Sequence, residues 1–333
     1  MLTALDGISF SIARGEILGL IGESGAGKSV AGAAIVGLVA SPGRITGGTI
    51  HLAGERIDNL PEEKLNAIRG KRIGMIFQDP MTSLNPLIRI GDQLVETIRR
   101  HLGLSPKQAR VRAIDLLAET GIPDPASRID AYPHEFSGGM RQRVVIALAL
   151  AGEPDLVIAD EPTTALDVSV QAAIIALIEK LCRERGTAVL LITHDMGVIA
   201  RATQRLAVMY AGRIIETGGT ESILGDSRHP YTRGLMQAIP PLRARPRRLV
   251  QIPGAMPRLV AMPKGCAFHP RCAIAEEQCR QFRPNLVGGA HQAVACHLSR
   301  AFSEEVDTGS SKENSVNQGL RAVDLIESDR PPV

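Results

Sequence analysis

Residues 22–29 are Gly22-Glu23-Ser24-Gly25-Ala26-Gly27-Lys28-Ser29, which fit the phosphate-binding pattern G-x-x-x-x-G-K-S. The apolar segment 16–21 predicts a short buried strand before this stretch, and the apolar residues from about Lys28 to Val39 predict a helix after it. The N–H groups of such a glycine-rich turn converge on phosphate oxygens, and the helix dipole adds its positive end. A chance match would not have this context. We therefore predict an α/β fold of the P-loop NTPase type, with a RecA-like core and a parallel sheet.

Each residue of the P-loop has an expected role in binding ATP. We expect all eight to contact the nucleotide, with Lys28 reaching the β- and γ-phosphates. The Ser29 hydroxyl is expected to bind Mg²⁺, because this hard ion prefers oxygen ligands and is shared with the phosphates.

Composition excludes several other classes of protein. Hydrophobic residues make up 44% and charged residues 22% of the 333-residue chain, which is ordinary for a globular protein. A net charge of +3 does not indicate a nucleic-acid partner. The longest strongly apolar run, residues 144–151, is far shorter than the roughly 20 residues of a spanning helix, and no signal sequence follows Met1. We expect a chain that neither spans a membrane nor is secreted, with its cysteines in a reducing cytoplasm.

Two carboxylates follow a predicted strand at residues 156–159. Because ligands of parallel sheets bind at the carboxyl ends of the strands, Asp160 and Glu161 are expected to lie beside the P-loop. Asp160 is then a candidate Mg²⁺ ligand, and Glu161 a candidate general base for the attacking water. The alternative is that both residues only cap the next helix.

The remaining pattern divides the chain. Strands are predicted at 48–52, 72–77 and 188–192, and a hairpin is predicted to turn at Ala211-Gly212. Between them, residues of about 84–150 predict an inserted helical subdomain, in which Ser105 and Gln108 resemble a capping box and Gly121 a helix stop. We place the ATPase domain at 1–227, a separate small module at 228–298 and a disordered tail at 299–333, because the tail has few large apolar residues.

The segment Phe136-Ser137-Gly138-Gly139-Met140-Arg141-Gln142-Arg143 resembles the signature motif of ABC transporter ATPases. Ser137, Gly138 and Gly139 precede a predicted helix and would form a second anion site at its N-terminus. In that family two ATPase domains pair head to tail, and each nucleotide lies between one P-loop and the partner's signature. This resemblance implies that the chain holds two half-sites. Met140 departs from the glutamine of many members.

Three further residues match motifs of the same family. Gln78 matches the loop glutamine that senses Mg²⁺ and the attacking water, and Asp167 matches the loop that faces the partner domain. His194 matches the switch histidine, which contacts the γ-phosphate and helps to position the water. With Glu161, we take Gln78 and His194 as the candidate catalytic residues.

Residues 77–86 and 229–233 resemble the oligopeptide, dipeptide and nickel importer branch, and the likeness extends over about 4–298. It implies a peripheral subunit on the cytoplasmic face of the inner membrane that imports peptides. Its partners would be a second ATPase in a heterodimer, two transmembrane permeases and a periplasmic binding protein. Nickel or another small solute is an alternative cargo. A non-transport ABC ATPase and a metal- or redox-regulated ATPase switch are alternative functions.

Four cysteines lie close together late in the chain, at Cys266, Cys272, Cys279 and Cys296. Five, six and sixteen residues separate them, which is atypical of a zinc ribbon. Peptide-importer ATPases of this branch include some with a [4Fe–4S] cluster on such cysteines, so the resemblance implies a cluster, with zinc or free thiols as alternatives. We expect Cys182, on an apolar helix face, to be a buried structural thiol.

The family also has an aromatic residue upstream of the P-loop that stacks on adenine, and this chain begins too late to include it. Phe10 alternates with Ile8 and Ile12 and is predicted to be a core strand residue. Either the true start lies upstream of Met1, or this form lacks both a first strand and an adenine platform. For this form we expect weakened ATP affinity.

Overall fold

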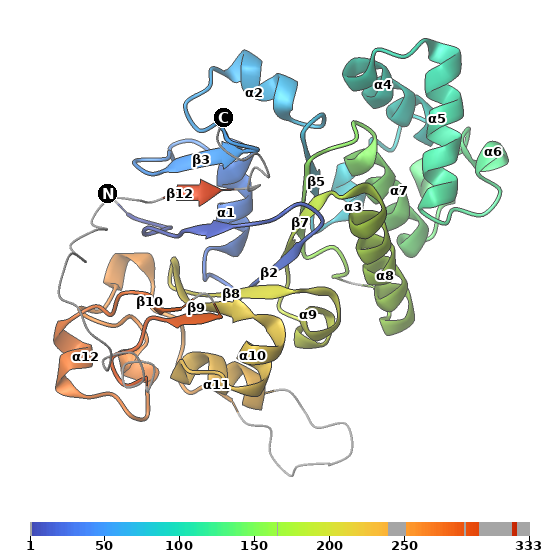
Figure 1. Ribbon diagram of the computed structural model, residues 1–333. Coiled ribbons are helices and arrows are strands. Elements are labelled where there is room, and N and C mark those ends of the chain that lie inside the picture. The colour runs from blue at the N-terminus through green and yellow to red at the C-terminus, as the bar shows by residue number, and fades with distance from the viewer. Residues whose placement is uncertain (1, 165, 239–250, 290, 300–321, 325–333) are drawn as a thin grey trace.

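A mixed sheet organises the molecule. The computed structural model describes residues 2–164, 166–238, 251–289, 291–299 and 322–324. Eight strands form the main sheet in the order β10-β11-β9-β8-β2-β7-β6-β5 (Figure 1). Strands β8, β2, β7, β6 and β5 are parallel, as predicted, whereas β9, β11 and β10 add an antiparallel edge. The strands are β1 Phe10–Ser11, β2 Ile17–Ile21, β3 Thr49–Leu52, β4 Glu55–Arg56, β5 Ile73–Ile76, β6 Leu156–Asp160, β7 Ala188–Ile192, β8 Arg205–Tyr210, β9 Arg213–Gly219, β10 Val287–Gly288, β11 Gln292–Val294 and β12 Ala322–Asp324.

Helices cover both faces of this sheet (Figure 1). They are α1 Lys28–Ile35, α2 Glu62–Ile68, α3 Pro80–Ser83, α4 Ile90–Leu102, α5 Pro106–Glu119, α6 Pro125–Arg128, α7 Gly138–Leu150, α8 Val168–Arg185, α9 Met196–Ala202, α10 Thr220–Gly225, α11 Pro230–Gln237 and α12 Glu277–Gln281. Short 3₁₀ turns occupy Pro133–Glu135, Leu259–Ala261 and His269–Arg271. Over the described ranges, we find no helix with the length and apolarity needed to span a bilayer.

The pleat of the strands sends alternate residues into two different cores. Leu18 and Leu20 of β2 pack with α1 in one apolar cluster, whereas Ile17 belongs to the cluster on the opposite face with α7 and α8. Every residue of β2, β6 and β7 is buried, which explains their continuous apolar sequence. Helix α1 is shorter than predicted, because it ends before Gly37, whose positive φ of 67° stops it.

Four helices between β5 and β6 pack against one another. Helices α4, α5, α6 and α7 lie within the predicted range 84–150 and pack together around an apolar core. The predicted capping box opens α5, because the Ser105 hydroxyl accepts a hydrogen bond from the Gln108 N–H and the Gln108 side chain accepts one from the Ser105 N–H. Gly121 follows this helix with φ of 75°, as expected for a stop signal.

The segment after residue 227 is built onto the ATPase sheet. Strand β11 pairs antiparallel with β9, which forms the predicted hairpin with β8. A third apolar cluster joins Tyr210 at the end of β8 to Tyr231 and Phe268 from the later segment. The segment predicted as a separate module therefore shares a sheet and a core with the ATPase, and the boundary at 227 stays a prediction.

A smaller sheet with the order β1-β12-β3-β4 lies beside α1 (Figure 1). Phe10 of β1 is buried, as expected of a core residue. Strand β12 inserts parallel between β1 and β3, pairing Val323 with Phe10 and Ile50. These three residues form a strand because the facing edges of β1 and β3 supply hydrogen-bonding partners, and the disordered tail at 299–333 stays a prediction. The remaining tail predictions concern 300–321 and 325–333, outside the described residues.

Candidate ATP site

The P-loop connects β2 to α1 as predicted. Gly22, Gly25 and Gly27 have φ angles of 154°, 84° and 103°, which favour glycine. A Cβ on Gly22 would lie only 2.3 Å from the carbonyl oxygen of Met209 at the end of β8. Glycine is thus required at this position by both backbone conformation and space.

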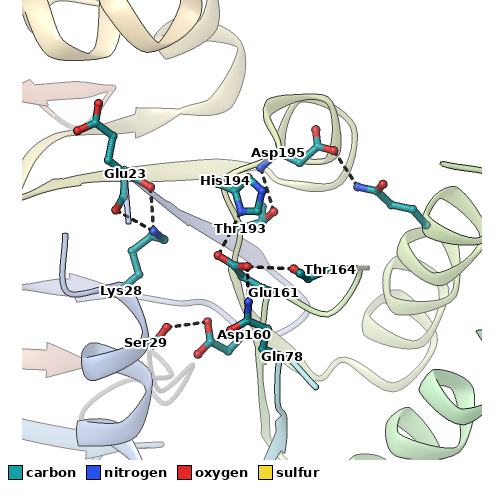
Figure 2. A network of polar contacts seen from close by, with 12 residues as sticks. Glu23, Lys28, Ser29, Gln78, Asp160, Glu161, Thr164, Thr193, His194 and Asp195 are labelled. Atoms are coloured by element: carbon teal, nitrogen blue, oxygen red, sulfur yellow. Dashed lines mark hydrogen bonds and ion pairs between the residues drawn. The ribbon is translucent and has the colours of Figure 1, made fainter. Parts of the chain in front are cut away.

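The side chain of Lys28 folds toward the start of the P-loop (Figure 2). Its Nζ donates to the carbonyl oxygens of Gly22 at 2.8 Å and Glu23 at 3.1 Å. Burial lowers the pKa of Lys28, and the negative charges of Glu161, Asp160 and Glu23 act in the opposite direction. Lys28 therefore lies near three carboxylates.

Ser29 and Asp160 meet across the site. The Ser29 hydroxyl donates to Asp160 Oδ1 at 3.1 Å, joining the first turn of α1 to the end of β6. Burial raises the pKa of Asp160, as does the nearby charge of Glu161, while the bond from Ser29 opposes this rise. Two hard oxygen donors side by side fit Mg²⁺, which is commonly bound by one or two protein oxygens with water and phosphate completing the shell.

Glu161 is held by three side chains (Figure 2). Gln78 Nε2 donates to Oε2 at 3.0 Å, the Thr164 hydroxyl donates to the same oxygen at 2.9 Å, and His194 Nδ1 lies 3.1 Å from Oε1. Burial alone would raise the pKa of Glu161, but the hydrogen bonds from His194 and Thr164 together hold it below its ordinary value. The site therefore contains an ionised, oriented carboxylate.

The backbone at Glu161 is unusual. Its φ of 48° lies in the left-handed region, which non-glycine residues seldom adopt, and its N–H donates to the Ile192 carbonyl at 2.8 Å. This turn directs the chain away from β6 just as the carboxylate emerges. The role of Thr164 was not predicted, although its position three residues after Glu161 was visible in the sequence.

The signature residues and Asp167 lie at neighbouring helix starts. Ser137 caps α7 by accepting from the Met140 N–H at 3.3 Å, and Asp167 caps α8 by accepting from the Val170 N–H at 2.9 Å. A Cβ on Gly139 would approach Val170 Cγ1 to 2.7 Å, so the two helices touch here. Within the described part of the chain, no hydrogen bond joins this group to Glu161, consistent with a separate surface.

The four clustered cysteines line one cavity of about 20 Å³, room for about one water molecule. Burial is the main cause of the raised pKa values of Cys266, Cys272 and Cys296. Among the residues that the structure describes, no group of three or more His, Cys, Asp or Glu is arranged to hold a metal ion. The iron–sulfur and zinc predictions thus find no support here.

Cys182 is buried, as predicted, and lies away from that cavity. Its Sγ donates to the Thr187 carbonyl at 2.9 Å, and burial raises the pKa of Cys182 to about 11.

Ser29 of the P-loop meets Asp160 at the end of β6, the oriented carboxylate of Glu161 follows directly, and the signature helix is capped. This combination defines an ATP-binding cassette ATPase. The family described as ABC transporter matches residues 5–164, and the oligopeptide/dipeptide transporter C-terminal region matches residues 215–279. The chain belongs to the ATP-binding subunits of the ABC transporter family and is an ATPase.

Relatives agree over most of the chain. The dipeptide transport ATP-binding protein DppD of Escherichia coli is 46% identical over 296 residues, covering 88% of this chain and 90% of DppD. The oligopeptide transport ATP-binding protein OppD of Haemophilus influenzae is 49% identical over 300 residues, covering 90% and 92%. Among solved structures, the ABC transporter cassette MJ0796 is 30% identical with a TM-score of 0.58, covering 65% of this chain and 90% of that one. CbiO1 of Clostridium perfringens is also 30% identical, with a TM-score of 0.57 and coverage of 67% and 84%.

Proposed function

We propose that residues 22–29 bind the phosphates of ATP and that Glu161 accepts the proton of the attacking water. The observation that carries this proposal is the Glu161 carboxylate, fixed by Gln78, Thr164 and His194 beside Ser29 and Asp160. Because its pKa is lowered, the carboxylate is ionised at neutral pH and free to accept a proton.

The remaining groups position the reaction. Gln78 and His194 hold opposite oxygens of the Glu161 carboxylate, which fixes the plane of the base. Ser29 and Asp160 would hold Mg²⁺, which when bound neutralises negative charge on the phosphates. Lys28 supplies a buried positive charge to the same phosphates.

Ser137, Gly138, Gly139 and Asp167 act, we propose, on the nucleotide of a second ATPase subunit. The capped start of α7, with its exposed Gly138, would bind an anion, and Asp167 lies at the neighbouring start of α8. Each subunit would then complete its partner's site.

Peptide uptake is the transport function that we propose. Its support is the match of residues 215–279 to the C-terminal region of oligopeptide and dipeptide transporters, together with the peptide transport names of the relatives. Transmembrane permeases are the partners such an ATPase implies. We further propose a heterodimer with a second ATPase, a periplasmic binding protein, and a position on the cytoplasmic face of the inner membrane.

Glu161→Gln tests the assignment of the base. The amide keeps the size of the side chain but cannot accept the proton, so ATP binding should persist while turnover falls by at least 100-fold, the scale of general-base catalysis. Exposed Glu184→Gln is the matched control and should hydrolyse ATP like the native chain. Near-native turnover by Glu161→Gln would remove Glu161 from the mechanism.

The cargo is tested in vesicles that contain this chain with its permeases and partner ATPase. Labelled di- and oligopeptides, and nickel in parallel, are offered with the binding protein in the presence of ATP. Peptide uptake that stops with Glu161→Gln supports the proposal. ATP-dependent uptake of nickel without peptide uptake would favour the alternative cargo, and hydrolysis with no transport would favour a non-transport ATPase.

For the four clustered cysteines, we propose a [4Fe–4S] cluster on family resemblance alone. Iron, sulfide and zinc analysis of anaerobically purified protein tests it. About four irons and four sulfides per chain would support the cluster, one zinc would replace it, and no metal would remove both, along with metal regulation of the ATPase.

A further inference from the structure

Glu23, the second residue of the P-loop, is held by two side chains from the C-terminal segment. The backbone N–H of Glu23 donates to the hydroxyl of Tyr231 at 2.8 Å, and the two residues are 208 positions apart in the sequence. Arg271, 248 positions away, donates from Nη1 and Nη2 to the two carboxylate oxygens at 2.7 and 3.0 Å. The P-loop is therefore bound, at both its backbone and a side chain, by the last part of the molecule.

Arg271 is itself fixed in place. Its side chain is 5% exposed, and its Nε donates to the Pro253 carbonyl at 2.8 Å. The guanidinium lies 5.8 Å from the ring centre of Tyr210 and 5.9 Å from that of Phe268, within the range of cation–π attraction. Because Pro253, Tyr210 and Phe268 all contact the planar guanidinium of Arg271, its Nη1 and Nη2 face the Glu23 carboxylate in one orientation.

Tyr231 is equally constrained. The side chain is fully buried, with its ring centre 4.7 Å from that of Tyr210 and 5.5 Å from that of Phe268, in edge-on contacts. Since Tyr210 ends β8 and Phe268 belongs to the later segment, the hydroxyl that receives the Glu23 N–H stands on a rigid aromatic cluster.

The pairing has an electrostatic consequence for the nucleotide. Glu23 carries a negative charge on a loop whose function is to bind phosphate, and that charge would repel ATP unless it were compensated. Arg271 supplies the compensation through two charge-assisted bonds. The Glu23 carbonyl also accepts from Lys28 Nζ at 3.1 Å, so the position of Glu23 affects the lysine expected to reach the phosphates.

We propose that Arg271 and Tyr231 are positioning residues for ATP: they fix Glu23, cancel its charge and thereby set the P-loop for phosphate. This inference rests on the proposed ATP site at residues 22–29. It gives the C-terminal segment a direct part in nucleotide binding, in addition to any part in transport.

Equilibrium binding of Mg-ATP to the full chain tests the proposal by a double-mutant cycle. Arg271→Met keeps an apolar stem but leaves Glu23 unpaired, so the Kd should rise about tenfold or more. Glu23→Gln in the same chain removes the repelling charge, and the double variant should return to within about threefold of the native Kd. Arg271→Lys keeps a charge without the two parallel donors and should bind with intermediate affinity.

Arg283→Met is the matched control, because Arg283 pairs with Asp6 elsewhere between the N-terminal and C-terminal parts and should leave the Kd unchanged. Native Kd values for both Arg271→Met and Arg271→Lys would overturn the proposal. So would a double variant as weak as Arg271→Met, because the arginine would then act on folding rather than through Glu23. Lys28→Ala distinguishes failure of this inference from failure of the proposed ATP site. If Lys28→Ala binds ATP with native affinity, the proposed ATP site at residues 22–29 is wrong.

Discussion

Acid should destabilise this protein through one buried histidine. His229 is 1% exposed, its imidazole Nδ1 accepts from the Tyr231 backbone N–H at 3.0 Å, and the backbone N–H of His229 donates to Glu216 Oε2 at 3.1 Å. The acceptor role requires the neutral imidazole. Burial lowers the pKa of His229 to about 3, well below the ordinary 6.5.

The lowered pKa of His229 determines how the free energy of unfolding changes with pH. Because the folded pKa is depressed, the unfolded chain binds the proton first, so the full stability is present above pH 6.5 and is lost as the pH falls toward 3. Each pH unit below 6.5 removes about 1.4 kcal/mol, so this residue costs about 2 kcal/mol of unfolding free energy between pH 7 and pH 5.

Urea unfolding at pH 7, 6 and 5 measures the effect, with His229→Asn as the comparison. Asparagine can still cap α11 but does not titrate in this range, so the variant should be less stable at pH 7 and lose about 2 kcal/mol less than the native chain on going to pH 5. Identical pH slopes for the two proteins would refute the reasoning, because they would show that His229 takes no part in the acid response.

Two further substitutions test the P-loop and the helical subdomain. Gly22→Ala should lower the free energy of unfolding by about 2 kcal/mol and weaken ATP binding, because the new Cβ would lie 2.3 Å from the Met209 carbonyl at a φ of 154°. Exposed Gly47→Ala, with nothing within 4 Å of its Cβ, should change stability by less than about 0.5 kcal/mol, and equal effects of the two in thermal unfolding would contradict the steric argument. Ser105→Ala should cost about 1 kcal/mol in urea unfolding because it removes the cap of α5, whereas Ser105→Gly should cost only a few tenths, and a neutral Ser105→Ala would show that the capping box adds no stability.

Local patterns predicted those parts of the fold whose causes are local. The strand before the P-loop, the capping box at Ser105 and the turn at Ala211-Gly212 each depend on a few adjacent residues, and each is present. The helical subdomain was predictable for the same reason, because apolar periodicity and stop signals act within single helices.

Contacts between residues distant in the sequence were harder to predict. Gln78, Glu161 and His194 could be named from motifs, but their meeting at one carboxylate depends on β5, β6 and β7 lying side by side. The addition of β11 to the edge of β9 was missed, since a three-residue strand has little pattern of its own. The four clustered cysteines are expected from the sequence to lie together. The small size of the cavity that they line, and the lack of a metal-holding group among the described residues, were not visible in their spacing.

The sequence by itself determined the chemistry available: a glycine-rich loop before Lys28 and Ser29, two carboxylates ending a strand, and a serine-glycine helix start. These follow from residue type and short spacing, which act without the rest of the chain. Only the tertiary structure decided that Glu161 has three partners and that Arg271 and Tyr231 reach back to Glu23. Such contacts join residues up to 248 positions apart, and it is the strand order and the shared core that bring them within hydrogen-bonding distance.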